Sequence, residues 1–151
     1  MKFIEQNKSF ELWISNYQFP DITDDYYDSN WLIVGIKLNE FEKNWITSDA
    51  SLLTYEYLRL SKWLKQAIGA KIQDKKIEFI EPNLEFELVD INDNNCKIRI
   101  YLNLESKPGW YKDDWGYSID ITVKKEQIEN SIERIESDLL RFPVRLTKSS
   151  S

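Results

Sequence analysis

The sequence predicts an α+β fold: a mainly antiparallel sheet with two helices packed on one face, forming a two-layer single domain. Segments in which apolar and polar residues alternate come in runs joined by short turns, as in antiparallel hairpins. Two longer segments, 52–68 and 125–140, repeat their apolar residues at the spacing of a helix that is buried on one side. A sheet whose apolar face is covered by such helices is a two-layer α+β fold.

The clearest alternation belongs to a hairpin within residues 77–105. Apolar residues occupy alternate positions on both sides of the turn 93–95, where asparagine tolerates the backbone of a tight loop. Pairing Phe86 with Leu102 places the apolar residues on one face, so we predict this register. Pro82 has no amide proton and marks a bend before the hairpin. The apolar positions are Leu84, Phe86, Leu88, Ile98, Ile100, Leu102 and Leu104.

Further strands are predicted at both ends of the chain. A first strand covers residues 10–14, and the nearly continuous apolar run 31–38 is typical of a central strand buried on both faces. A short strand follows near 41–46, and alternation over 117–123 marks the last strand. Within the apolar run, Gly35 predicts a bulge or a close contact with a helix.

Each predicted helix has recognisable end signals. Ser51 or Thr54 is suited to cap the first helix by accepting a free amide proton, and Gly69 to end it in the left-handed conformation. The second helix stops at Phe142-Pro143. We expect the whole chain, residues 1–151, to form one domain with a frayed tail over 146–151.

Composition narrows the range of functions. The 151 residues carry a net charge of −6, which argues against direct binding to nucleic acid. There is no histidine, so the usual general base and metal ligand are missing. The single cysteine excludes an internal disulfide, and there is no apolar run of signal-peptide or membrane-spanning length. We therefore expect a cytoplasmic protein that does not associate with membranes.

Acidic residues offer two chemical hypotheses. The spacing of the acids in loop 21–28 differs from that of a calcium-binding EF-hand, so no metal is predicted. Glu81, Glu85 and Glu87 invite comparison with the paired carboxylates of glycosidases. Glu85 and Glu87 fall on the solvated strand face, however, and Glu81 is better suited to brace a loop by accepting backbone amides. Hence neither catalytic residues nor a cofactor are predicted.

Two acidic segments rich in Tyr and Trp are candidates for a protein-binding site. Large amphipathic rings supply desolvated contact area and nearby acids steer a basic partner. The alternative, in which these rings fold back onto the core, stays open. The residues of the predicted partner-binding site are Asp21, Asp24, Asp25, Tyr26, Tyr27, Asp28, Trp110, Tyr111, Asp113, Asp114 and Trp115.

Short motifs spread over residues 17–145 carry a family resemblance through their order and spacing. They are Tyr17-Gln18-Phe19-Pro20, Asp28-Ser29-Asn30-Trp31-Leu32, Leu53-Thr54 with Glu56, Trp63-Leu64, Phe79, Glu81-Pro82-Asn83-Leu84, Phe86, and Phe142-Pro143 with Arg145. The set resembles the WapI-like immunity proteins of bacterial polymorphic-toxin systems.

The resemblance implies an immunity protein that binds a cognate toxin domain, often a nuclease, and neutralises it stoichiometrically. It carries over no catalytic residue, and it places Trp31, Glu81, Pro82 and Asn83 in the signature of the fold. A basic toxin fits the acidic composition, and we expect the free protein to be a monomer or a weak homodimer. The alternatives are an enzyme that uses carboxylates alone on a carbohydrate, and an adaptor module for another protein. A toxin gene next to this one would favour the immunity protein.

Overall fold

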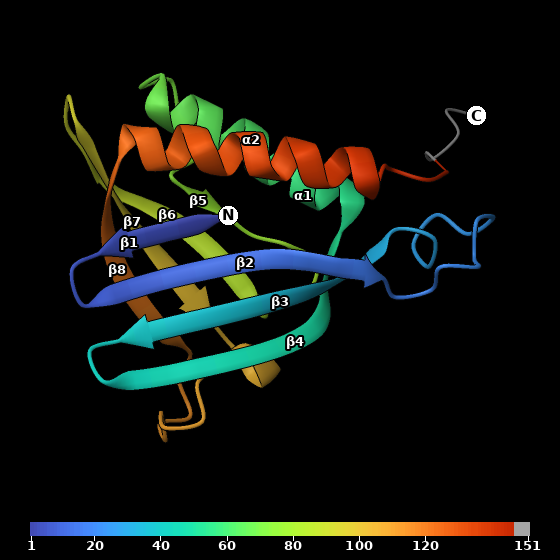
Figure 1. Ribbon diagram of the computed structural model, residues 1–151, viewed down its shortest axis with the longest axis horizontal. Helices are drawn as coiled ribbons and strands as arrows, with labels where there is room; N and C mark the ends of the chain where they lie inside the picture. The colour runs from blue at the N-terminus through green and yellow to red at the C-terminus, as the bar shows by residue number, and fades with distance from the viewer. Residues whose placement is uncertain (147–151) are drawn as a thin grey trace.

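The computed structural model describes residues 1–146 and contains two antiparallel sheets of four strands each and two helices (Figure 1). The α+β class and the antiparallel pairing are confirmed, but the strands divide into two sheets where one was expected. The first sheet holds β1 (Lys2–Glu5), β2 (Lys8–Tyr17), β3 (Trp31–Glu40) and β4 (Lys43–Leu53). The second holds β5 (Lys76–Ile77), β6 (Leu84–Ile91), β7 (Asn95–Leu102) and β8 (Tyr117–Lys124).

The helices follow the two sheets in the sequence. Helix α1 (Thr54–Ile68) comes after the first sheet and α2 (Lys125–Arg141) after the second. The two lie next to each other on the same side of the molecule (Figure 1). A 3-10 turn, η1 (Leu104–Ser106), begins the loop between β7 and β8. Apart from Leu146, the tail that we expected to be frayed lies outside the described residues.

The two sheets meet along β1 and β8. The Thr122 amide donates a hydrogen bond to the Glu5 carboxylate (2.8 Å), and the Lys8 ammonium donates to the Asp120 carbonyl (3.1 Å). On the opposite side, the Trp45 indole N–H donates to the Ser106 carbonyl (3.0 Å), which ties β4 to η1. The sheets are therefore joined on both sides of the space between them.

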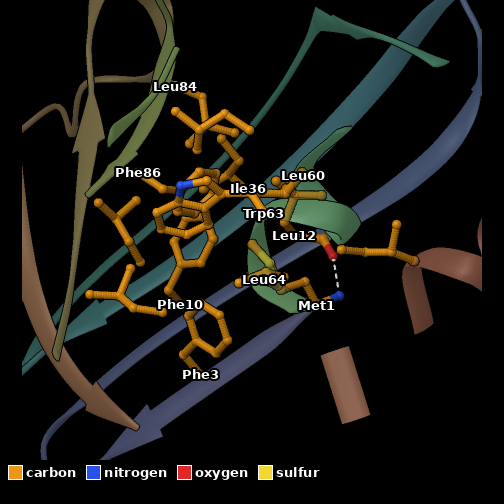
Figure 2. Packing of buried hydrophobic residues seen from close by; sticks show 14 of the residues in the cluster. Met1, Phe3, Phe10, Leu12, Ile36, Leu60, Trp63, Leu64, Leu84 and Phe86 are labelled. Carbon is orange, nitrogen blue, oxygen red and sulfur yellow. Dashed lines mark hydrogen bonds between the residues drawn. The ribbon is translucent and has the colours of Figure 1, made fainter. Parts of the chain in front are cut away.

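The core fills the space between the inner faces of the sheets and both helices, and α2 contributes Ile128, Ile132 and Ile135 to it. Phe10 of the first sheet and Phe86 of the second meet edge to face, with ring centroids 6.0 Å apart (Figure 2). Leu60, Trp63 and Leu64 enter the same cluster from α1. Burial of these apolar side chains from both sheets and both helices is the main stabilisation of the fold.

The central hairpin has the predicted inner face except at Leu104, which lies in η1 and is 60% exposed, and its register differs from the prediction. Phe86 pairs with Ile100 and Leu84 with Leu102, so the predicted register is wrong by two residues. Side chains alternate with period two, so this shift leaves the same residues on the buried face. A bulge between Leu88 and Asp90 then changes the pairing near the turn.

Gly35 makes room for a neighbouring side chain. It pairs with Trp13 of β2, and a Cβ placed on Gly35 would lie only 2.1 Å from Cε2 of the Trp13 indole. The close contact is thus made by an adjacent strand, and both alternatives that we expected, a bulge at Gly35 and a contact with a helix, are wrong. Only a residue without a side chain fits under the indole in this position.

The ends of α1 differ from the prediction. Leu53 precedes the helix, and neither Ser51 nor Thr54 caps it with a side chain. Gly69 has φ −82°, and the left-handed residue is Ala70, with φ 53°. The start of the helix is held instead by the Glu56 carboxylate, which accepts the Leu53 amide (3.1 Å). A buried acceptor from inside the helix has replaced the expected hydroxyl cap.

Candidate partner-binding site

The two loops predicted to bind a partner lie at opposite ends of β3. Loop 21–28 precedes the first residue of this strand. Loop 110–117 is bound to its other end, because the Tyr117 hydroxyl donates to the carboxylate of Glu40, the last residue of β3. A ten-residue strand spans roughly 30 Å. The fold therefore does not bring the two loops together.

Loop 21–28 presents its carboxylates to solvent. Asp21, Asp24, Asp25 and Asp28 are all exposed. The Asp25 carboxylate also accepts the amides of Tyr27 (2.9 Å) and Asp28 (2.8 Å), which fixes a tight turn. This local bonding gives the loop a defined shape.

The tyrosines of this loop form a short aromatic row. Tyr26 is half-buried and stacks on Tyr55 of α1, with centroids 5.2 Å apart, and it meets Tyr27 edge to face at 5.0 Å. Tyr27 is 48% exposed. Of the two rings predicted here, Tyr27 is the one available to a partner, while Tyr26 supports it.

Asn30 anchors the loop to the rest of the protein. Its side chain is fully buried, and its carbonyl oxygen accepts the Thr54 hydroxyl (2.6 Å) and the Arg145 amide (2.9 Å). Its NH₂ group donates to the Tyr26 carbonyl (2.8 Å). One side chain thus joins the loop, the start of α1 and the segment after α2.

The cation next to this loop is already bound. The Arg145 guanidinium lies 3.6 Å from the centroid of the Tyr17 ring and donates to the carbonyls of Pro20 (2.7 Å) and Ile22 (3.1 Å). Its partners are a ring and neutral backbone atoms. Within residues 1–146, the Arg145 charge thus lies against the start of the loop without forming an ion pair with its aspartates.

Loop 110–117 contains both core-packed and exposed residues. Trp110 and Tyr111 are half-buried and meet Tyr117 edge to face, at 6.3 and 5.4 Å. Asp113 and Asp114 are exposed, and Trp115 is 82% exposed. The alternative in which the loop rings fold back onto the core thus describes Trp110 and Tyr111, which pack against the core.

A hollow beside loop 21–28 gathers acidic residues that sequence reasoning did not connect. We call it the acidic hollow, and its volume is about 420 Å³. Its lining is Gln18, Phe19, Asp28, Trp31, Asp49, Ala50, Glu81, Asn83 and Glu105. Four carboxylates from four separate segments therefore surround one depression.

Within the acidic hollow, one carboxylate is held in place. The Asn83 side chain is 3% exposed and donates to the Glu105 carboxylate (3.0 Å). Hydrogen bonds from the Glu105 amide and then from Asn83 lower the pKa of this carboxyl group. Glu105 therefore stays ionised at neutral pH.

The role of loop brace that we predicted for Glu81 belongs to Glu56. The Glu56 carboxylate is 2% exposed and accepts the Ile80 amide (2.8 Å) as well as the Leu53 amide. Burial raises its pKa, against the effect of both hydrogen bonds. The segment before Pro82 is thus fixed from α1, which leaves Glu81 to line the acidic hollow.

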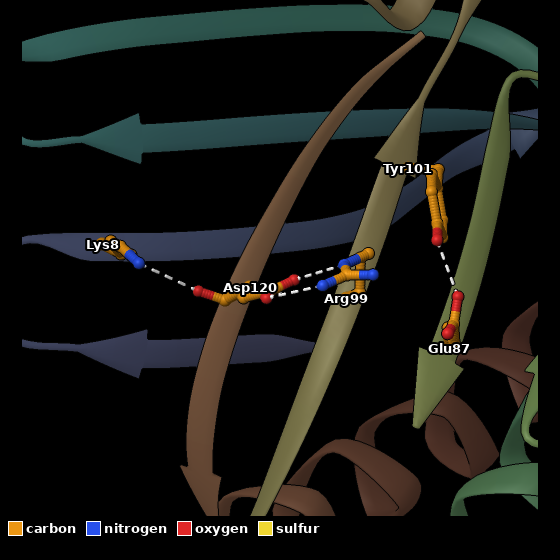
Figure 3. Close-up of polar contacts among 5 residues, drawn as sticks. All are labelled: Lys8, Glu87, Arg99, Tyr101 and Asp120. Carbon is orange, nitrogen blue, oxygen red and sulfur yellow. Dashed lines mark hydrogen bonds and ion pairs between the residues drawn. The ribbon is translucent and has the colours of Figure 1, made fainter. Parts of the chain in front are cut away.

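Charged groups on the outer face of the second sheet form pairs. Arg99 binds the Asp120 carboxylate through two hydrogen bonds (2.7 and 3.0 Å), which lower the pKa of Asp120 (Figure 3). The Tyr101 hydroxyl donates to Glu87 (2.6 Å), and Lys76 pairs with Glu85 (3.1 Å). Glu85 and Glu87 thus have structural partners of their own.

Two further findings concern chemistry and membranes. Across residues 1–146, no group of three or more His, Cys, Asp or Glu side chains is arranged to hold a metal ion. In the same part of the chain, no helix has the length and apolar character needed to cross a bilayer.

Exposed rings and carboxylates that form no ion pair among the described residues are features suited to binding another protein. The sequence matches the family described as "Immunity protein WapI-like family" over residues 2–143, and the chain belongs to this family. None of the curated proteins compared with the chain matches it. The resemblance carried by the short motifs is confirmed. Immunity proteins bind cognate toxins and are generally not enzymes, so the class of partner follows from the family.

Proposed function

We propose that this protein neutralises a cognate toxin domain, a basic nuclease, by covering its active surface in a stoichiometric complex. Family membership supports the general role. The nature of the toxin is inferred from the carboxylates of loop 21–28 and the acidic hollow, which form no ion pair within residues 1–146. This charge is the observation that carries the proposal.

The physical reason is complementarity with a phosphate-binding surface. A nuclease presents Lys and Arg where it meets the nucleic-acid backbone. Carboxylates placed on a rigid scaffold attract the same cations and increase the rate of encounter. A protein with net charge −6 and a concentrated acidic surface is suited to block such a site.

The contact residues that we propose are those of loops 21–28 and 110–117. Because these loops lie at opposite ends of β3, each can be tested without disturbing the other. Within them, Tyr27 and Trp115 are the most exposed rings, and the aspartates supply the charge.

The decisive experiment uses a candidate cognate toxin domain, chosen as one whose gene lies next to the gene of this protein. We expect it to form a one-to-one complex with this protein in size-exclusion chromatography and to lose nuclease activity in that complex. A toxin domain of the same enzymatic class from an unrelated system is the control, and its activity should not change. If the neighbouring toxin domain stays active at a molar excess of this protein, the proposal is wrong.

Replacing Asp24 and Asp25 with asparagine should slow association about tenfold at low salt and reduce its salt dependence. Charges at the rim of an interface act mainly on encounter, and salt screens them. In Asp25→Asn the side chain keeps an oxygen that can accept the two amides of the turn, so the loop should retain its shape. Stopped-flow mixing at several salt concentrations measures the effect. An association rate equal to that of the unaltered protein would place these charges outside the encounter surface.

Replacing Tyr27 with alanine should speed dissociation and weaken the complex by about 2 kcal/mol, as loss of an interfacial anchor does. The exposed ring contributes little to folding, so the free energy of unfolding should change by less than about 0.5 kcal/mol. Trp110→Ala is the comparison, because its ring packs on Tyr117 and its loss should also destabilise the fold. Surface plasmon resonance and urea unfolding separate the two effects. A Tyr27→Ala protein that unfolds easily but binds normally would contradict the interface role.

We also infer that the protein has no hydrolase activity of its own. The carboxylates that invited a glycosidase comparison have structural partners, as for Glu85 and Glu87, or line an open hollow, as for Glu81. Purified protein should therefore turn over neither glycans nor nucleotides. Turnover that disappears in Glu81→Gln or Glu85→Gln would overturn this inference.

A further inference from the structure

We propose that the acidic hollow receives a lysine or arginine side chain of the toxin domain and forms the centre of the complex. This inference rests on the proposed function and deepens it, because it selects one end of β3 and names the group that is recognised.

The first support is the convergence of charge. Asp28 follows β2, Asp49 lies in β4, Glu81 precedes β6 and Glu105 lies in η1. Throughout residues 1–146, none of these four carboxylates takes part in an ion pair, and no lysine or arginine lines the hollow. The lining thus carries four negative charges and no positive one, so an incoming cation gains attraction from several carboxylates at once.

The second support is the presence of rings in the same lining. Phe19 is 37% exposed, and Trp31 is half-buried at the start of β3. Aromatic faces attract ammonium and guanidinium groups and also contact the aliphatic stem of these side chains. Rings and carboxylates together match both parts of a lysine or arginine.

The third support is rigidity. Asn83 orients Glu105, and the Asn103 side chain donates to the Pro82 carbonyl (2.7 Å). The Asn103 amide also donates to the Asn83 carbonyl (2.9 Å). Groups that are fixed before binding lose little conformational entropy when a partner arrives. The side of the hollow that Asn83 and Glu105 form is therefore preorganised.

The other end of β3 has a different charge pattern. There, Lys43 lies over Trp110 (5.9 Å), Lys107 lies over Tyr111 (5.8 Å), and the Lys112 ammonium donates to the Gly109 carbonyl (2.8 Å). The Lys107 ammonium also donates to the Asp113 carbonyl (2.7 Å), so three cations belong to the same end of the molecule as Asp113 and Asp114. Charge complementarity with a basic partner thus favours the acidic hollow.

The test compares two triple variants that each remove three negative charges. Asp28→Asn, Asp49→Asn and Glu81→Gln together remove three of the four negative charges of the hollow. The control is Glu126→Gln, Glu129→Gln and Glu133→Gln together, because these glutamates are exposed on α2 and lie outside both proposed contact loops. The probe is the neighbouring gene's toxin domain, inactivated and titrated by calorimetry at low and moderate salt. We expect at least 100-fold weaker binding and a smaller salt dependence for the hollow variant, and a change within about threefold for the control. Circular dichroism verifies that both variants are folded.

A double-mutant cycle identifies the inserted side chain. Single Lys→Ala and Arg→Ala changes on the toxin domain are combined with Glu81→Gln. For the toxin variant that lacks the inserted side chain, Glu81→Gln should cause almost no further loss of affinity. If both triple variants weaken binding equally, or if the hollow variant binds as well as the unaltered protein, this inference is overturned while the proposed function stands. If the unaltered protein does not bind the toxin domain, both are overturned.

Discussion

Replacing Phe86 with alanine should lower the free energy of unfolding by about 3–5 kcal/mol, as for other large core rings. The Phe86 ring is fully buried and meets Phe10 at 6.0 Å and Phe79 at 6.4 Å, both edge to face. Since Phe10 belongs to the first sheet and Phe86 to the second, the cavity would open where the two sheets meet. Loss of this contact removes burial and aromatic packing together.

Two controls define this expectation. Phe86→Leu keeps an apolar side chain in the same place and should cost less than the alanine variant. Phe41, which is 67% exposed, can be changed to alanine with an effect within about 0.5 kcal/mol. Urea unfolding followed by circular dichroism gives all three values. A loss below about 1 kcal/mol for Phe86→Ala would be incompatible with its place in the core.

Replacing Asn30 with alanine should destabilise the fold by about 3 kcal/mol or more and also weaken toxin binding. The change leaves the Thr54 hydroxyl, the Arg145 amide and the Tyr26 carbonyl without their hydrogen-bond partner. Each buried polar group that loses its partner costs about 1–3 kcal/mol. The same change frees loop 21–28, so its carboxylates and Tyr27 lose their fixed position.

Asn39 offers a matched control with the same chemical change. Its NH₂ group donates to the Ser9 hydroxyl (2.9 Å), while its carbonyl oxygen has no partner among the described residues. Asn39→Ala should therefore cost about 1 kcal/mol or less. Thermal and urea unfolding compare the two variants. Equal losses for Asn30→Ala and Asn39→Ala would show that the hydrogen bonds of Asn30 do not hold the loop.

Periodic patterns made part of the fold predictable. The alternation around Phe86 identified the buried face, because a strand that is wet on one side must alternate. It did not determine the register, since a shift of two residues keeps every side chain on the same face. The helical segments were likewise predictable from their apolar stripes, whereas the cap of α1 was not, because Glu56 acts from within the helix.

The candidate site was less accessible to sequence reasoning because it is assembled from distant segments. Asp49 and Glu105 resemble ordinary solvated residues in the sequence, and only the approach of η1 to β4 brings them to one hollow. The aspartates of loop 21–28 could be found from composition alone. The separation of this loop from loop 110–117 could not be predicted from composition, because it depends on the end of β3 at which each loop lies. The short motifs that carry the family resemblance gave a further signal, because they include Trp31 and Glu81, which line the hollow.

The order of elements in this chain has a kinetic consequence. Four strands that pair in sequence are followed by a helix, and the same succession then occurs a second time. Each strand pair joins neighbours along the chain, so its loop closes at a small entropic cost. Only the joining of the two halves, where β1 meets β8 and α1 meets α2, requires distant segments to find each other. We therefore expect local hairpins to form early and the union of the halves to limit the folding rate, and fragments cut within the exposed connector 69–71 to reassemble when mixed.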